Sequence, residues 1–157
     1  EAAVIGAETG WLAYGLDVAG YATAAIDVRT GEKYGLGVYP IARYMRVQAD
    51  LLDPPLAAGA YDLLVYQEGL PAVDDETRWD ILVKNAQRGL RSGGWMAIMA
   101  FDLVTADPIE ARLRAAGMTL MEKPQRQGMR VKLGDIRDRV LGRNQTAPPV
   151  IVAQKKG

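Results

Sequence analysis

Four short segments of this chain carry glycine, acidic or amide residues, and each one follows an apolar run. Residues 6–10 (Gly-Ala-Glu-Thr-Gly) follow the first run, and Asp27 follows the second, about 20 residues further on. Asp50 follows the third run, and residues 66–68 (Tyr-Gln-Glu) end the fourth. A glycine turn before a helix lets the backbone approach a ligand closely and offers it free N–H groups. A carboxylate after the second run can accept hydrogen bonds from two ribose hydroxyls. The order of these segments therefore indicates a nucleotide-type site.

Alternating strands and helices are needed to bring these segments together. The apolar run before Gly6, the apolar residues at helical spacing after Gly10 and the run before Asp27 make a βαβ unit, which implies parallel strands. The same patterns predict further elements along the chain. We expect strands at 2–5, 21–26, 44–49, 61–66, 95–100, 118–122, 129–133 and 150–153, and helices at 11–19, 74–89, 107–117 and 135–141.

This alternation is typical of an α/β fold with a doubly wound, mostly parallel sheet. In such sheets ligands bind beyond the carboxyl ends of the strands, which is where all four segments fall. The 157 residues suit a single domain, residues 1–157. Because the first strand begins almost at residue 1, we expect its N-terminal cover to be short or missing.

The composition excludes several kinds of chemistry. The chain has no cysteine and no histidine, which removes thiolate catalysis, disulfides, the commonest general base and the commonest zinc ligand. We therefore expect no metal site, and the lack of cysteine fits a cytoplasmic protein. No apolar run approaches the ~20 residues of a membrane span, so we expect no membrane partner.

Charge is unevenly distributed although the formal net charge is zero. Residues 1–111 hold 8 Lys and Arg against 16 Asp and Glu, whereas residues 112–157 hold 11 against 3. The simpler interpretation is a solvated C-terminal region. The alternative is a basic rim, centred on residues 123–143, that would attract an acidic substrate or a nucleic acid.

The motifs taken together resemble those of the class I S-adenosylmethionine-dependent methyltransferases, over nearly the whole chain. The resemblance rests on residues 6–10, on Ile26-Asp27, on residues 47–51, on residues 61–65 and on residues 90–94 (Leu-Arg-Ser-Gly-Gly). It implies a seven-stranded sheet of order 3-2-1-4-5-7-6, with the last strand antiparallel and helices on both faces. It also implies S-adenosylmethionine as the cofactor.

The resemblance further implies roles for single residues. Asp27 would hold the ribose hydroxyls, and Asp50 would accept from the adenine amino group beside Leu51. Tyr66 and Gln67 would form the wall between the cofactor and the methyl acceptor. The loop under the methionine part of the cofactor would consist of Gly6, Ala7, Glu8 and Gly10.

Two positions depart from the family pattern. Val4 stands where the family usually has an acid that anchors the ammonium end of the cofactor, and Glu8 stands where it usually has a glycine. The Glu8 carboxylate could replace the missing acid, or the two changes could mark a chain that has lost cofactor binding. Trp11 could cover the cofactor, although a core position on the first helix is the simpler expectation.

Methyl transfer requires mainly positioning, and a hydroxyl or ammonium acceptor also benefits from a base. Glu68 and Tyr66 are the candidate catalytic residues, with Tyr34 a further candidate by location. We expect a small-molecule acceptor. A nucleic-acid acceptor is less favoured because no aromatic residues accompany the basic segment. A homodimer is a further expectation, since the first strand lacks cover.

Two other functions compete with methyl transfer. A nicotinamide-dependent oxidoreductase would need glycine at the positions of Gly6, Glu8 and Trp11, and only the first fits. A degenerate methyltransferase-like domain that binds or scaffolds a partner remains the main alternative, because a fold alone does not establish activity.

Overall fold

The computed structural model describes residues 1–67, 76–99, 103–121 and 150–157 of the chain. The expected strand at 129–133, the expected helix at 135–141, the basic segment 123–143 and Glu68 lie outside these residues.

Strands and helices alternate along the described residues, as expected from the apolar runs. In chain order the elements are β1 (Ala2–Ile5), α1 (Trp11–Val18), β2 (Thr23–Asp27), the short 3-10 helix η1 (Leu36–Val38), β3 (Met45–Gln48), β4 (Tyr61–Tyr66), α2 (Glu76–Gly89), β5 (Leu90–Met99), α3 (Leu103–Ala115), β6 (Thr119–Leu120) and β7 (Val150–Gln154).

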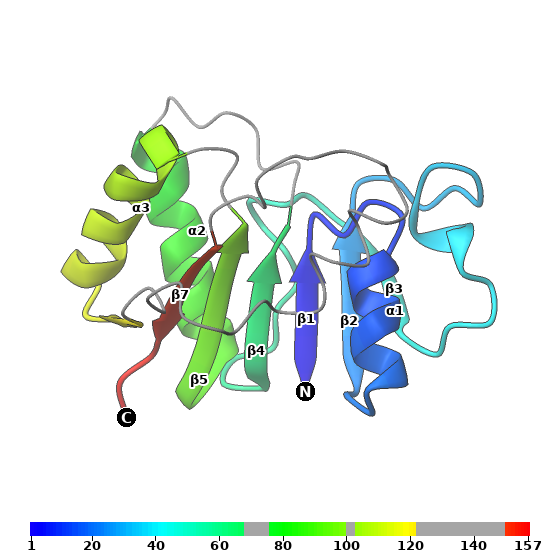
Figure 1. Ribbon diagram of the computed structural model, residues 1–157, viewed down its shortest axis with the longest axis horizontal. Helices are drawn as coiled ribbons and strands as arrows, with labels where there is room; N and C mark the ends of the chain where they lie inside the picture. Colours follow the sequence, from blue (N-terminus) through cyan, green and yellow to red (C-terminus); the bar gives the residue numbers. More distant parts are fainter. Residues whose placement is uncertain (68–75, 100–102, 122–149) are drawn as a thin grey trace, which may run out of the picture.

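The strands form one seven-stranded sheet of order β3-β2-β1-β4-β5-β7-β6, which confirms the expected order. The first five strands of that row pair in parallel, whereas β7 is antiparallel to both β5 and β6, so the sheet is mixed. Figure 1 shows β1, β2 and β4 pointing to the same edge of the sheet. The segments that follow these strands therefore meet at one edge.

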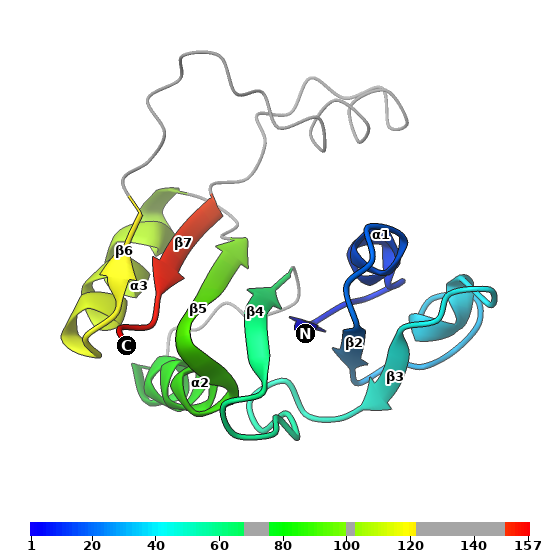
Figure 2. The ribbon, with the colours of Figure 1, turned by 90° about the horizontal axis from the view of Figure 1, so that it is seen from below.

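The core consists of two clusters, one on each face of the sheet, and alternate residues of each strand belong to alternate clusters. Successive side chains of a strand point to opposite faces. One cluster takes Ile5, Ile26 and Tyr66 with buried residues of α2 and α3, and the other takes Val4, Ala25 and Val65 with α1. Figure 2 shows α1 and α2 on either side of the row of strands. Since β1 and β2 are buried along their whole length, the loops at their ends start from fixed points.

Two predicted boundaries differ from the structure by four or more residues. Residues 91–94, expected as a turn before the fifth strand, lie inside β5. The register with β4 shifts between Tyr61 and Leu63, and Gly93 there has φ +75°. A glycine pair suits such an irregularity within a strand as well as it suits a turn, so the pattern could not distinguish them.

The start of the third helix is also different from the one expected. Asp107-Pro108 was expected to begin it, but α3 begins at Leu103. Pro108 lies within the helix, where its missing N–H removes one intrahelical hydrogen bond without ending the helix.

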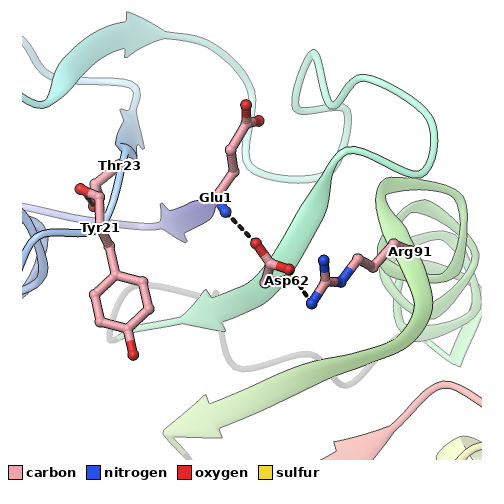
Figure 3. Close-up of polar contacts among 5 residues, drawn as sticks. All are labelled: Glu1, Tyr21, Thr23, Asp62 and Arg91. Atoms are coloured by element: carbon pink, nitrogen blue, oxygen red, sulfur yellow. Dashed lines mark hydrogen bonds and ion pairs between the residues drawn. The ribbon is translucent and has the colours of Figure 1, made fainter.

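The amino ends of the central strands carry an ionic network (Figure 3). The amino group of Glu1 hydrogen-bonds to Asp62 on β4, and Arg91 Nη2 lies 2.5 Å from Asp62 Oδ1. The hydrogen bond from the Glu1 amino group, followed by Arg91, holds the pKa of Asp62 below its ordinary value. These charges join β4 to β5 at the edge opposite to the expected site.

Candidate functional site

The loop of residues 6–10 leaves β1 and turns sharply into α1. The N–H groups of Gly6 and Ala7 both donate to the Ile26 carbonyl oxygen, at 2.9 and 3.1 Å, so the loop lies against the end of β2. Gly6 has φ +71°, Glu8 +48° and Gly10 +78°. Glycine adopts such angles readily, whereas Glu8 is held in a backbone conformation that side-chain-bearing residues rarely adopt.

Gly10 is required by packing as well as by its backbone angle. A Cβ atom at this position would lie 3.0 Å from Tyr44 Cζ and closer still to the Tyr44 hydroxyl. That hydroxyl donates to the Leu36 carbonyl oxygen at 2.9 Å, which fixes the ring beneath the loop. Tyr44 is therefore a supporting residue of the loop. The apolar pattern predicts Tyr44 only as the start of a strand at 44–49, and no local pattern links it to Gly10.

Asp27 ends β2 and fastens two loops to each other. Its side chain is 3% exposed. Its Oδ2 accepts from the Glu8 N–H at 2.8 Å, and its Oδ1 accepts from the Arg29 N–H at 2.9 Å. The Arg29 Nε also lies 3.6 Å from Oδ1. A carboxylate oxygen can accept two hydrogen bonds, so each oxygen retains acceptor capacity after these contacts.

Asp50 and Leu51 follow β3 on the outer side of Asp27. The Ala49 N–H donates to the Asp27 carbonyl oxygen at 3.1 Å, which places this segment next to the end of β2. Asp50 is exposed, and its Oδ1 accepts from the Leu52 N–H at 2.9 Å. Leu51 is partly buried against the core cluster of Tyr66. The structure thus presents a carboxylate to solvent with an apolar side chain beside it.

Tyr66 and Gln67 follow on the other side of the glycine loop. The Gln67 N–H donates to the Ile5 carbonyl oxygen at 2.9 Å, which continues the pairing of β4 with β1. Gln67 is 1% exposed and Tyr66 is fully buried. Within the described part of the chain, the Tyr66 hydroxyl and Gln67 Oε1 have no hydrogen-bond partner. Most buried polar atoms are satisfied, so two exceptions at the predicted site call for an explanation.

Burial raises the pKa of Tyr66 well above its ordinary value, so its hydroxyl stays protonated at neutral pH. A neutral phenol can donate a hydrogen bond but cannot act as a base. Its ring packs in the core cluster that includes buried residues of α2 and α3, so the structure gives no support to Tyr66 as the catalytic base.

Replacing Tyr66 by phenylalanine is expected to raise the free energy of unfolding by about 1 kcal/mol, because it removes a buried hydroxyl without a partner. The raised pKa adds a pH dependence. Above the unfolded pKa of 10 the unfolded state releases the phenol proton while the folded state keeps it, so the stability of the wild type falls as the pH rises toward the folded pKa. Urea unfolding at pH 7 and at pH 9–11 should show the wild type losing stability faster than Tyr66→Phe above pH 10. Parallel pH curves would contradict this.

The remaining candidates are less closely connected to the site. Tyr34 is 73% exposed and lines an open hollow of about 540 Å³, formed by residues 28–34 and Gln48. Trp11 is partly exposed and belongs to neither core cluster, so the expectation of a core position is wrong. A second hollow, between α2 and α3, is lined by Asp80 and Arg112 among others and belongs to neither the loop nor the strand ends.

The described residues contain no group of three or more metal-ligating side chains, and none of their helices has the length and apolar character needed to cross a membrane. The geometry is that of a polar cradle: a glycine loop, the carboxylate of Asp27 below it and polar groups at the ends of β3 and β4. Such a cradle can bind a nucleoside through hydrogen bonds.

Comparison with solved structures identifies the fold. The N-methyltransferase NodS of Bradyrhizobium japonicum superposes with a TM-score of 0.71 at 18% identity, over 99% of this chain and 85% of that one. A TehB-like SAM-dependent methyltransferase of Corynebacterium glutamicum gives 0.65 at 15%, over 99% and 80%. The fold is that of the S-adenosylmethionine-dependent methyltransferases.

A third neighbour with this methyltransferase fold is RsmC of T. thermophilus, a 16S rRNA N2 methyltransferase in complex with AdoMet and guanosine. It gives a TM-score of 0.65 at 17% identity over 99% of this chain, which spans 35% of RsmC. No protein-family profile and no curated protein sequence matches the chain. At these identities the likeness concerns the fold.

Proposed function

We propose that this protein binds S-adenosylmethionine at the carboxyl edge of β1 to β4 and transfers its methyl group to a small molecule. The observation that carries the proposal is the pair of hydrogen bonds by which Asp27 connects two loops. One buried carboxylate holds both the glycine loop after β1 and the segment after β2 at hydrogen-bond distance. Asp27 and these two loops lie at the edge where open α/β sheets bind nucleotides, in a fold shared with methyltransferases.

The residues present fit the cofactor. The backbone at Gly10 lies so close to Tyr44 that only a glycine leaves the cradle undistorted, and Asp27 keeps acceptor capacity for the ribose hydroxyls. Asp50 offers its carboxylate to the adenine amino group, and Leu51 offers an apolar surface. When bound, the cofactor supplies a methyl group that its positive sulfur has already activated.

The protein's own contribution is therefore positioning and exclusion of water. The backbone of Gly6, Ala7 and Glu8 shapes the surface on which the ligand lies. We place Tyr66, whose hydroxyl is protonated at neutral pH and has no partner among the described residues, in the wall between cofactor and acceptor at the end of β4. Glu68 remains our candidate base for an acceptor that must lose a proton, since it directly follows Gln67 in the chain.

The methyl acceptor could be a small molecule or a nucleic acid, and a small molecule is the simpler proposal. NodS is named an N-methyltransferase and RsmC an rRNA methyltransferase, so this fold serves both kinds of acceptor. We favour the small molecule because the sequence offers no aromatic residues with its basic segment. The neighbours give no support to the alternative of an inactive binding or scaffold module. We propose a cytoplasmic location because the chain lacks cysteine. The expectation that the protein forms a homodimer stays a prediction.

Thermal unfolding with different nucleotides tests the proposal. S-adenosylmethionine and S-adenosylhomocysteine, each at about 100 times its dissociation constant, should each stabilise the protein by about 2.7 kcal/mol and raise the midpoint by several degrees. NAD at the same concentration is the matched control and should produce no shift. A cooperative transition that none of these ligands moves would contradict cofactor binding.

A further inference from the structure

The side-chain oxygen of Gln67 is a buried hydrogen-bond acceptor that no described residue uses. This atom, Oε1, has no hydrogen-bond partner among the described residues, and the residue is 1% exposed. Leaving such an acceptor unpaired destabilises the folded state, and a hydrophobic side chain at this position would avoid that penalty. A ligand with an N–H group could supply the hydrogen bond that this acceptor lacks at the end of a central strand.

The backbone places Gln67 beside the first residue of the glycine loop. Its N–H donates to the Ile5 carbonyl oxygen, so Gln67 continues β4 alongside Gly6. The pairs Val4 with Val65 and Ile5 with Tyr66 precede it in the same register. By alternation its side chain belongs to the face of Val4 and Val65, which is also the face of Asp27. Val4, fully buried and apolar, offers no polar atom there.

The order of the strands determines which polar side chain of the protein lies near which hydrogen-bond donor of the ligand. Asp50 follows β3 and Asp27 ends β2, both on one side of the glycine loop, whereas Gln67 follows β4 on the other side. S-adenosylmethionine carries three kinds of hydrogen-bond donor: the adenine amino group, the ribose hydroxyls and the ammonium group. With the first two assigned to Asp50 and Asp27, the ammonium group is the donor that remains for the far side of the loop.

We propose that Gln67 Oε1 accepts a hydrogen bond from the ammonium group at the amino-acid end of the cofactor, an inference that rests on the proposed function. The bond is charge-assisted and forms in a site shielded from water, which makes it stronger than a neutral one. A neutral amide also avoids the repulsion that a carboxylate would exert on the carboxylate of the same ligand. Gln67 thus supplies the contact that Val4 cannot.

Binding measurements on two related ligands test this role without any methyl acceptor. S-adenosylhomocysteine carries the amino-acid end, whereas 5′-methylthioadenosine lacks it and keeps the adenine and ribose. By calorimetry, Gln67→Leu should bind S-adenosylhomocysteine at least ~10-fold more weakly, the loss of about one charge-assisted hydrogen bond, with its affinity for 5′-methylthioadenosine unchanged. Gln67→Glu, which keeps an acceptor at the same place, should bind S-adenosylhomocysteine more tightly than Gln67→Leu.

A matched control and the wild type separate the possible failures. Gln154→Leu makes the same chemical change on β7, where the amide donates to the Gly93 carbonyl oxygen, and both affinities should stay unchanged. If the wild type binds neither ligand, the proposed function itself fails. If the wild type binds both and Gln67→Leu weakens neither, or weakens both equally, only the role of Gln67 is overturned. If Gln67→Leu does not fold, the wild type alone provides the test. Equal affinity of the wild type for the two ligands would overturn the role of Gln67, because the amino-acid end would then contribute nothing to binding.

Discussion

Replacing Asp27 by alanine is expected to lower the free energy of unfolding by about 3 kcal/mol, because two hydrogen bonds to a charged acceptor are lost at about 1.5 kcal/mol or more each. The N–H groups of Glu8 and Arg29 would then lack their acceptor, and the loops after β1 and β2 would no longer be joined. We therefore also expect the thermal shift with S-adenosylhomocysteine to disappear. Urea unfolding at pH 7 measures the first effect, and the ligand-induced shift of the midpoint measures the second.

Asp50→Ala is the matched control for Asp27. Its carboxylate also accepts a backbone N–H two residues ahead, that of Leu52, but it is exposed. Its loss should cost less than about 1 kcal/mol, as for surface changes in general. Asp27→Asn separates charge from shape, since it keeps the size of the side chain and one acceptor oxygen. Equal stability of Asp27→Ala and Asp50→Ala would show that Asp27 does not join the loops.

Replacing Gly10 by alanine should cost about 3 kcal/mol, from a backbone term of about 1–2 kcal/mol and an overpacking term of similar size. The angle φ +78° is unfavourable for any residue with a Cβ, and that Cβ would press on the ring of Tyr44. The loop would have to move away from β2, so the affinity for S-adenosylhomocysteine should fall as well. Denaturant unfolding and calorimetry measure the two effects.

Gly20 and Tyr44 provide the controls. Gly20 has φ +92° but nothing within 4 Å of its would-be Cβ, so Gly20→Ala should show the backbone term alone, about 1–2 kcal/mol. In the double variant Gly10→Ala with Tyr44→Phe, the hydroxyl that meets the new methyl group is absent, and part of the loss should be recovered relative to Tyr44→Phe alone. Equal effects of Gly10→Ala and Gly20→Ala would rule out the contact with Tyr44.

The alternation of strands and helices could be predicted because its causes are local, whereas the order of the strands and the antiparallel last strand came from the resemblance to the methyltransferases. Apolar runs long enough for buried strands alternate with glycine turns and helical patterns, and parallel strands bring their carboxyl ends together. That places Asp27, Asp50 and Gln67 at one edge without any knowledge of contacts. The same reasoning could not distinguish a turn from an irregularity within β5, since Gly93 and Gly94 suit both.

The internal contacts of the site could not be predicted, because they depend on residues far apart in the chain. Tyr44 meets Gly10 across 34 positions, and no spacing rule links a residue that precedes a strand to a helix start. The hydrogen bonds that the N–H groups of Glu8 and Arg29 donate to the Asp27 carboxylate were also not predicted. The missing partner of Gln67 Oε1 is likewise visible only once packing is known.

The position of β7 affects the order in which this protein can fold. β7 is the last described strand in the chain, yet it lies between β5 and β6 in the sheet. Until residues 150–154 leave the ribosome, β6 lacks the strand with which it pairs, and one side of β5 has an open edge. During synthesis, at about 5–20 residues per second, the β3-β2-β1-β4-β5 part can form several seconds before the sheet is closed. The nascent chain would therefore present the carboxyl edge of β1 to β4, where we propose that the cofactor binds, before the sheet is complete.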